Sequence, residues 1–219
     1  MTEQDFAAER AAMVEEQLRQ RGIGDTAVLQ AMRAIPRELF VPEAYRLRAY
    51  HDCPLPLPHN QTISQPYVVA YMISLLRLQP EDVVLEIGAG SGYAAAILGQ
   101  LARVVYTIER HDELVSYAQK RLSHLGCHNV HVVQGDGTQG YPDQAPYDAI
   151  VVAAGGPAVP QSLKEQLAIM GRLVMPVGSD RRQQHLVRLI RLENGRYREE
   201  HKGAVAFVPL IGSEGWPTG

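Results

Sequence analysis

The stretch Val83–Tyr93, with the sequence VVLEIGAGSGY, constrains the fold of this chain most strongly. Its apolar start predicts a buried strand, and the following residues, Ala94–Leu98, predict a helix, so the stretch opens a βαβ unit. Between the two, three glycines in five positions let the backbone pass close to a ligand, because no Cβ stands in the way. The unpaired N–H groups at the start of the helix would point into the same space. The sequence therefore predicts a ligand site at this turn.

Two residues of the turn indicate which ligand it suits. The fingerprint for dinucleotides requires a glycine at the position of Tyr93, which this chain lacks. Glu86 lies two residues before the first glycine, where a carboxylate would repel a pyrophosphate but attract an ammonium or sulfonium group. The pattern Glu-x-Gly-x-Gly-x-Gly resembles motif I of the S-adenosylmethionine-dependent methyltransferases. The alternative is a tight turn between strand and helix that binds nothing.

Two further acidic residues follow the next predicted strands. Glu109 ends the apolar run 104–109, and Asp136 follows the run 130–133. Ligands of a parallel sheet bind outside the carboxyl ends of its strands, so we expect both acids beside the glycine turn. There Glu109 can accept hydrogen bonds from both ribose hydroxyls, and Asp136 can accept one from the amine of adenine. Taken singly, Glu109 could be a surface charge or a helix-start partner, and Asp136 a turn residue.

These three strand ends define the predicted cofactor site, and together they favour S-adenosylmethionine over NAD. The predicted cofactor-binding residues are Glu86, Gly88, Ala89, Gly90, Ser91, Gly92, Glu109, Arg110, Asp136 and Gly137. No metal ligand is assigned, because the eight histidines and two cysteines are scattered and show no spacing typical of a metal site.

Predicted strands and helices alternate through the middle of the chain, which indicates an α/β fold. We expect a Rossmann-like, doubly wound, mostly parallel sheet with helices on both faces, in a single methyltransferase domain of 219 residues. Residues 1–62 are predicted to form a helical and loop lead-in, and 63–180 the cofactor-binding core. Residues 181–211 are predicted to form a C-terminal antiparallel hairpin and a final strand, and the Gly- and Pro-rich residues 212–219 a flexible tail.

Local patterns predict several element boundaries. Helical spacing indicates a first helix over 5–21 and a second helix that Asp25 caps. Beyond the core motifs, the sequence predicts a helix near 160–169 and a strand over 171–176. The apolar run 204–210 predicts the final strand.

The overall charge and the cysteine content indicate the class of protein. The formal net charge of −3 lacks the basic surplus of a nucleic-acid binder. Cys53 and Cys127 are far apart and predict no disulfide framework. The N-terminal residues lack the apolar segment of a signal peptide, and no apolar run reaches membrane-spanning length. We therefore expect a cytoplasmic monomer that binds neither nucleic acid nor membranes.

Several segments of the chain closely resemble the protein-L-isoaspartate O-methyltransferases, and the match runs from about residue 10 to about residue 211. The most specific segment is TISQP at Thr62–Pro66, because the general methyltransferase motif does not contain it. The other matching segments are AIPRELFVP at 34–42, the residues around TISQP in QTISQPYVVA at 61–70, the glycine motif at 85–93, HNV at 128–130, GDG at 135–137, PYDAI at 146–150 and FVPL at 207–210.

The resemblance implies an enzyme that moves the methyl group of S-adenosylmethionine onto the free α-carboxylate of L-isoaspartyl residues in damaged proteins and peptides, leaving S-adenosylhomocysteine. In the family, the methyl ester then cyclises to a succinimide, whose hydrolysis regenerates some normal aspartyl. Ser64 matches the active-site serine of the family. The residues implied to bind the substrate are Thr62, Ile63, Ser64 and Gln65.

The chemistry of the substrate is consistent with this resemblance. A carboxylate, with a pKa near ~4, is already ionised at neutral pH and needs no general base to attack a methyl carbon. Ser64 precedes a predicted helix start at Pro66, where its hydroxyl and the nearby N–H groups would suit an anion. We expect Ser64 to position the substrate and not to act as a nucleophile. The alternative is that Ser64 is an ordinary helix N-cap.

The chain departs from the family at three places. Glycine is usual near His59–Asn60, and a second glycine is frequent at the position of Met170. Past residue 210 the chain lacks the polar tail of many relatives, some of which contact the cofactor there. No cofactor contact is therefore assigned to Ile211 or Trp216.

Three other functions remain open from the residues alone. Another S-adenosylmethionine-dependent methyltransferase could act on a small molecule or on RNA, although the near-neutral charge disfavours RNA. A nucleotide-binding oxidoreductase is disfavoured by Tyr93 and Glu86. A binding module without catalysis is disfavoured by the intact segment around Ser64.

Overall fold

A seven-stranded sheet forms the centre of the computed structural model, which describes residues 2–181 and 183–217. Its strands are β3 Val83–Ile87, β4 Val104–Glu109, β5 Val130–Gln134, β6 Tyr147–Val152, β7 Leu167–Asp180, β8 Gln183–Arg191 and β9 Tyr197–Val205. They lie in the order β5-β4-β3-β6-β7-β8-β9. The strands β3 to β7 pair in parallel, and β8 and β9 add an antiparallel edge. A separate two-stranded ribbon pairs β1 Leu55–Pro56 with β2 Thr62–Ile63.

Helices lie on both faces of this sheet, which confirms the predicted doubly wound α/β fold. Neighbouring residues of a strand point to opposite faces. Val84 and Ala149 therefore enter one hydrophobic cluster, and Leu85 and Ile150 enter another. The first cluster lies under α3 Pro66–Leu76, α4 Tyr93–Gly99 and α5 Asp112–His124. The second lies under α6 Gln161–Glu165 and the short turns η5 Gly137–Gln139 and η6 Pro142–Gln144.

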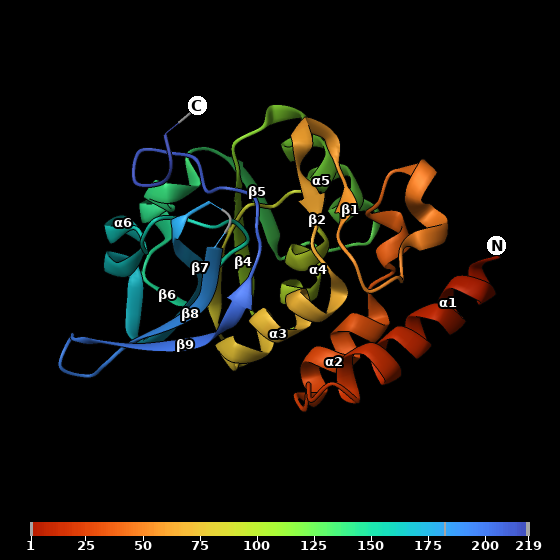
Figure 1. Cartoon of the computed structure of the whole chain (residues 1–219), viewed down its shortest axis with the longest axis horizontal. Helices are drawn as coiled ribbons and strands as arrows, with labels where there is room; N and C mark the ends of the chain where they lie inside the picture. The colour runs from red at the N-terminus through yellow and green to blue at the C-terminus, as the bar shows by residue number, and fades with distance from the viewer. Residues whose placement is uncertain (1, 182, 218–219) are drawn as a thin grey trace.

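The N-terminal lead-in packs its helices against α3 and α4 (Figure 1). Its elements are α1 Glu3–Ala12, the π-helical turn η1 Met13–Arg19, α2 Thr26–Ala34 and the short helices η2 Arg37–Leu39, η3 Glu43–Arg48 and η4 Pro58–Asn60. The helix predicted over 5–21 therefore exists but changes its winding after Ala12. Asp25 caps α2 as predicted, because its Oδ1 accepts hydrogen bonds from the N–H groups of Ala27 and Val28 at 3.1 Å. Within the described ranges, no helix is long and apolar enough to cross a membrane.

Two predicted boundaries in the C-terminal half are wrong. The helix expected near 160–169 ends at Glu165, because the buried Leu167 already pairs with Tyr147 and starts β7. The separate strand expected over 204–210 does not form. Its first two residues extend β9, and the later ones leave the sheet edge to exchange backbone hydrogen bonds with Gly155.

The C-terminal residues fold back over the carboxyl ends of the strands. The backbone N–H of Ser213 donates to Asp136 Oδ2 at 2.8 Å, and the indole N–H of Trp216 donates to the Gly155 carbonyl at 3.0 Å. The prediction of a flexible tail, which rests on glycine and proline content, therefore does not describe residues 212–217. Residues 218–219 of that prediction lie outside the described part of the chain.

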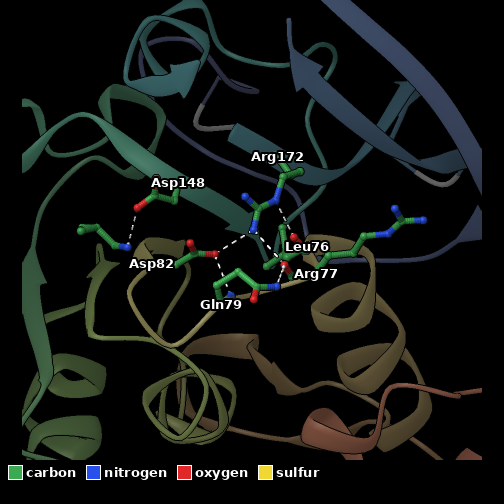
Figure 2. A network of polar contacts seen from close by, with 7 residues as sticks. Leu76, Arg77, Gln79, Asp82, Asp148 and Arg172 are labelled. Carbon is green, nitrogen blue, oxygen red and sulfur yellow. Dashed lines mark hydrogen bonds and ion pairs between the residues drawn. The ribbon is translucent and has the colours of Figure 1, made fainter. Parts of the chain in front are cut away.

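A partly buried polar network joins the sheet to α3 at the other end of the strands (Figure 2). The Arg172 Nη2 group forms an ion pair with Asp82 Oδ2 at 2.8 Å. The same guanidinium donates from Nε to the Leu76 carbonyl at 2.6 Å and from Nη2 to the Arg77 carbonyl at 3.0 Å. Arg77 ends α3 in the left-handed conformation, at φ +51°. Arg172 therefore satisfies the unpaired carbonyls at the end of the helix that follows the TISQP segment.

We expect Arg172→Lys to lower the free energy of unfolding by about 2 kcal/mol. Lysine keeps the charge opposite Asp82 but cannot reproduce the planar fork, so about two hydrogen bonds of about 1 kcal/mol each are lost. Urea denaturation followed by circular dichroism would measure the change, with Arg196→Lys as the control on an exposed side chain. Equal stability of the two variants would show that the network contributes nothing beyond charge.

Candidate active site

A cavity of about 960 Å³, part of which is open solvent, lies at the carboxyl ends of β3, β4 and β6. It brings together eleven of the predicted site residues: Thr62, Ile63, Ser64, Glu86, Gly88, Ala89, Gly90, Ser91, Glu109, Arg110 and Gly137. Gln65, Gly92 and Asp136 are not among the residues that line it. The two predicted halves of the site, the cofactor turn and the TISQP segment, therefore face one cavity.

The glycine turn has the backbone conformation that its sequence predicts. Gly88, Gly90 and Gly92 have φ values of +93°, +53° and +86°, which L side chains rarely adopt. The N–H groups of Gly88 and Ala89 donate to the Ile108 carbonyl at 2.8 and 3.2 Å, which ties the turn to β4. A Cβ on Gly92 would lie 3.2 Å from the Ala118 side chain, so Gly92 allows α4 to pack closely against α5. The turn therefore needs glycine both for its conformation and for helix packing.

Glu86 lies under the turn and is 1% exposed. Burial raises the pKa of its carboxyl group to about 8, although a hydrogen bond from Thr107 opposes the shift and the charge of Glu109 adds to it. The Thr107 hydroxyl donates to Glu86 Oε2 at 2.6 Å. The sequence predicts an ionised Glu86, whereas in the ligand-free protein the group is mostly protonated at neutral pH. A cationic ligand group would favour the ionised form and lower this pKa.

Glu109 holds the turn as well as facing the cavity. Its Oε2 accepts a hydrogen bond from the Gly90 N–H at 3.0 Å. Its Oε1 accepts from the N–H groups of Arg110 and His111 at 2.9 and 3.0 Å. A carboxylate offers about four acceptor positions, so roughly one remains for a ligand hydroxyl. The predicted contact with both ribose hydroxyls is therefore limited to a single well-formed hydrogen bond in this arrangement.

Asp136 is not a lining residue of the cavity, and its carboxylate accepts hydrogen bonds from the following turn and from the C-terminal residues. Its Oδ1 accepts from the N–H and hydroxyl of Thr138 at 2.9 and 2.7 Å, and its Oδ2 accepts from the Ser213 N–H. Burial raises the pKa of Asp136, but the hydrogen bonds from Ser213 and Thr138 outweigh burial and hold it below its ordinary value. Asp136 thus keeps about one acceptor position for the predicted contact with adenine, although only its neighbour Gly137 lines the cavity.

Ser64 is half-buried on the cavity wall, directly before α3. The N-cap residue of α3 is Gln65, and no side chain caps the helix, so the interpretation of Ser64 as an N-cap is wrong. Among the described residues, the Ser64 hydroxyl has no hydrogen-bond partner. The Gln65 amide instead donates to the Asp52 carboxylate at 2.7 Å and to its carbonyl at 3.1 Å. Gln65 therefore fastens the segment, and Ser64 is free to contact a ligand.

Sequence reasoning missed several residues of the cavity wall. His111 follows Glu109, and its ring stacks on that of His59, but nothing distinguishes these two from the other histidines in the sequence. The segment Val208–Ile211 also lines the cavity, although no cofactor contact is predicted for Ile211. This segment reaches the cavity through backbone hydrogen bonds with Gly155, a contact between distant parts of the chain that local patterns do not indicate.

The departures from the family coincide with unusual backbone geometry. His59, Asn60 and Met170 have φ values of +59°, +56° and +64°. These are the places where the resemblance leads one to expect glycine. The chain therefore keeps a glycine-type backbone while carrying side chains there, at a cost of about 1 kcal/mol for each residue. At His59 and Asn60 this geometry lies directly before the TISQP segment.

Comparison with known proteins is consistent with this site. The family model described as Protein-L-isoaspartate(D-aspartate) O-methyltransferase (PCMT) matches residues 8–215. Protein-L-isoaspartate O-methyltransferase 1 of Rhodopseudomonas palustris (strain HaA2) is 60% identical over 211 residues, covering 96% of this chain and 86% of the relative.

Two solved structures show the same fold over nearly the whole chain. A protein-L-isoaspartate O-methyltransferase superimposes with a TM-score of 0.86 and 29% identity, covering 94% of this chain and 67% of the other. A beta-aspartate methyltransferase from Plasmodium falciparum, in complex with S-adenosyl-L-homocysteine, has a TM-score of 0.80 and 25% identity, covering 92% of this chain and 98% of the other. The chain belongs to the protein-L-isoaspartate O-methyltransferase family.

Proposed function

We propose that the cavity holds S-adenosylmethionine against the glycine turn and an isoaspartyl carboxylate against Ser64. The reaction is that of the family: the methyl group of S-adenosylmethionine is transferred to the free α-carboxylate of L-isoaspartyl residues in damaged proteins. The observation that supports the proposal best is that one cavity joins two buried acids to a serine hydroxyl that has no hydrogen-bond partner among the described residues.

The residues on the donor side fit an adenosyl ligand with a positive charge. Glu86 gains a counter-charge from an ammonium or sulfonium group, which offsets the unfavourable burial of its carboxylate. Glu109 keeps about one acceptor position for a ribose hydroxyl. Gly88 and Gly90 keep the backbone within reach of the ligand. S-adenosylmethionine supplies an electrophilic methyl group on a sulfonium.

On the acceptor side, the chain has only to place the nucleophile. The substrate carboxylate is ionised at neutral pH, so no general base is required. The Ser64 hydroxyl donates a hydrogen bond to this anion and holds it in line with the methyl carbon and the sulfur. The Gln65–Asp52 hydrogen bonds keep the Ser64 backbone in place during transfer.

The domain organisation, the location, the oligomeric state and the partners belong to the same proposal. We infer a single-domain, cytoplasmic monomer that needs neither nucleic acid nor a membrane. The net charge of −3 supports the absence of a nucleic-acid partner, and the two free thiols, Cys53 and Cys127, support the cytoplasmic location. Outside the enzyme, a backbone amide nitrogen of the substrate then displaces methanol from the methyl ester to form a succinimide, whose hydrolysis regenerates part of the normal aspartyl.

An isoaspartyl peptide and its aspartyl twin test the proposed function. Each is incubated with the protein and S-adenosylmethionine carrying a labelled methyl group. The proposal predicts base-labile label in the isoaspartyl peptide only. Equal labelling of both peptides, or of neither, would reject the repair activity, and labelling of small metabolites alone would favour the small-molecule methyltransferase.

The affinity for S-adenosylhomocysteine is expected to rise with pH. Ligand binding requires the ionised form of Glu86, whose pKa in the free protein is about 8. Binding below that value therefore releases a proton, and affinity should rise about tenfold from pH 6 to pH 7 and level off near pH 8. Isothermal titration calorimetry measures both the affinity and the proton release. Glu86→Gln should remove this slope, and a slope that persists in the variant would exclude Glu86 as its origin.

A further inference from the structure

Three side chains connect the loop before the TISQP segment to the start of α5, and we call them the histidine clasp: His59, His111 and Glu113. The rings of His59 and His111 stack with their centroids 4.8 Å apart and their planes 10° apart. The Nε2 atom of His59 lies 2.8 Å from Glu113 Oε2, in the first turn of α5. The clasp therefore joins two segments that are far apart in the sequence.

The segments that the clasp joins both contribute residues to the lining of the cavity. His59 belongs to η4, and the residues that follow it, Gln61–Ser64, line the acceptor side. His111 lines the donor side and gives its N–H to Glu109. The clasp is thus a direct side-chain link between the substrate segment and the segment that holds the predicted ribose ligand.

The substrate segment depends on such links because its own secondary structure is small. The strand β2 pairs only with β1, in a ribbon of two residues per strand that is separate from the main sheet. A two-stranded ribbon of this kind has little stability by itself. The Gln65–Asp52 hydrogen bonds fasten the end of the segment nearest α3, and the clasp fastens the other end.

The backbone at the clasp is held in an unfavourable conformation. His59 and Asn60 both have positive φ, although neither is glycine. Strain of this kind persists where surrounding contacts determine the conformation, and it is frequent at functional sites. Here the left-handed turn directs the His59 ring onto His111. Burial lowers the pKa of His111, and the charge of Arg110 adds to this shift while that of Glu109 opposes it.

We propose that the histidine clasp holds the segment Gln61–Ser64 in register with the bound methyl donor, and that His59 is a positioning residue for methyl transfer. This inference rests on the proposed function. Because the donor's contacts are on the strand ends, loss of the clasp should weaken peptide binding and leave donor binding intact.

The test compares His59→Gly with Asn60→Gly. Both variants place glycine at a positive φ in the same loop and relieve the same kind of strain, but only the first removes the clasp. For His59→Gly we expect KM for the isoaspartyl peptide to rise about fivefold, the effect of one stacked pair and one exposed ion pair. The Kd for S-adenosylhomocysteine and the melting temperature should stay at the wild-type values. Asn60→Gly should leave all three quantities unchanged, because the strain that it relieves is offset by the larger conformational entropy of glycine in the unfolded chain.

A second pair of variants isolates the ion pair. Glu113→Gln removes the charge opposite His59, whereas Asp112→Asn removes a charge from the same exposed helical turn without touching the clasp. Glu113→Gln should raise KM in the wild type but have no further effect in His59→Gly. If the wild-type protein is active and His59→Gly and Asn60→Gly have equal KM values, the positioning role of the clasp is wrong but the proposed function stands. An inactive wild-type chain would overturn the proposed function and the clasp with it.

Discussion

Replacing Glu109 with alanine is expected to weaken binding of S-adenosylhomocysteine by about a hundredfold. The substitution removes a hydrogen bond between a charged acceptor and the ligand, which contributes about 1.5–3 kcal/mol. It also releases the Gly90 and His111 N–H groups that Glu109 holds at 3.0 Å, so the glycine turn loses its fixed position. Calorimetric titration of the purified variant gives the dissociation constant directly.

Two further variants separate these contributions. Glu109→Gln keeps one acceptor oxygen for the turn and should bind with an intermediate affinity. Glu81→Ala removes an exposed carboxylate just before β3 and should bind like the wild type. An unaltered dissociation constant in Glu109→Ala would contradict the ribose assignment and the role of Glu109 in the turn.

Replacing Ser64 with alanine is expected to lower kcat about thirtyfold without changing the affinity for S-adenosylhomocysteine. The hydroxyl has no partner within the described part of the chain, so it is available to hold the substrate carboxylate, and a hydrogen bond to a charged group is worth roughly 2 kcal/mol. The melting temperature should not fall, because Gln65 and not Ser64 occupies the N-cap position of α3. Steady-state kinetics with an isoaspartyl peptide measure the effect.

Ser74→Ala is the matched control for this experiment. Ser74 is a half-buried serine in α3, the helix that follows Ser64. Its hydroxyl donates to the Tyr71 carbonyl at 2.8 Å, and it does not line the cavity. Its kcat should equal that of the wild type. If Ser64→Ala also turned over at the wild-type rate, Ser64 would have no part in placing the substrate.

The parts of the fold that local sequence determines were open to prediction. The run Val83–Ile87 is apolar and of strand length, and the glycines after it adopt the positive φ values that only glycine tolerates well. Asp25 caps its helix through contacts two and three residues away. Glu86 and Glu109 reach one cavity because the ends of adjacent parallel strands meet at one edge of the sheet.

Contacts between distant residues explain what the sequence alone does not indicate. The sequence predicts that Asp136 accepts from adenine, but it does not indicate that the N–H of Ser213, 77 positions later, donates to the same carboxylate. His59 and His111 become neighbours only after the loop and α5 are in place. The protonation of Glu86 depends on its burial, which the position of a carboxylate in a motif does not show.

A crystal structure of the protein with S-adenosylhomocysteine and an isoaspartyl peptide measures the arrangement that all of these roles require. It should place the amino-acid end of the ligand at residues 86–92, a ribose hydroxyl on Glu109, and the peptide carboxylate on the Ser64 hydroxyl. A ligand whose amino-acid end lies away from residues 86–92, or a peptide carboxylate out of reach of Ser64, would contradict the assignment of this cavity.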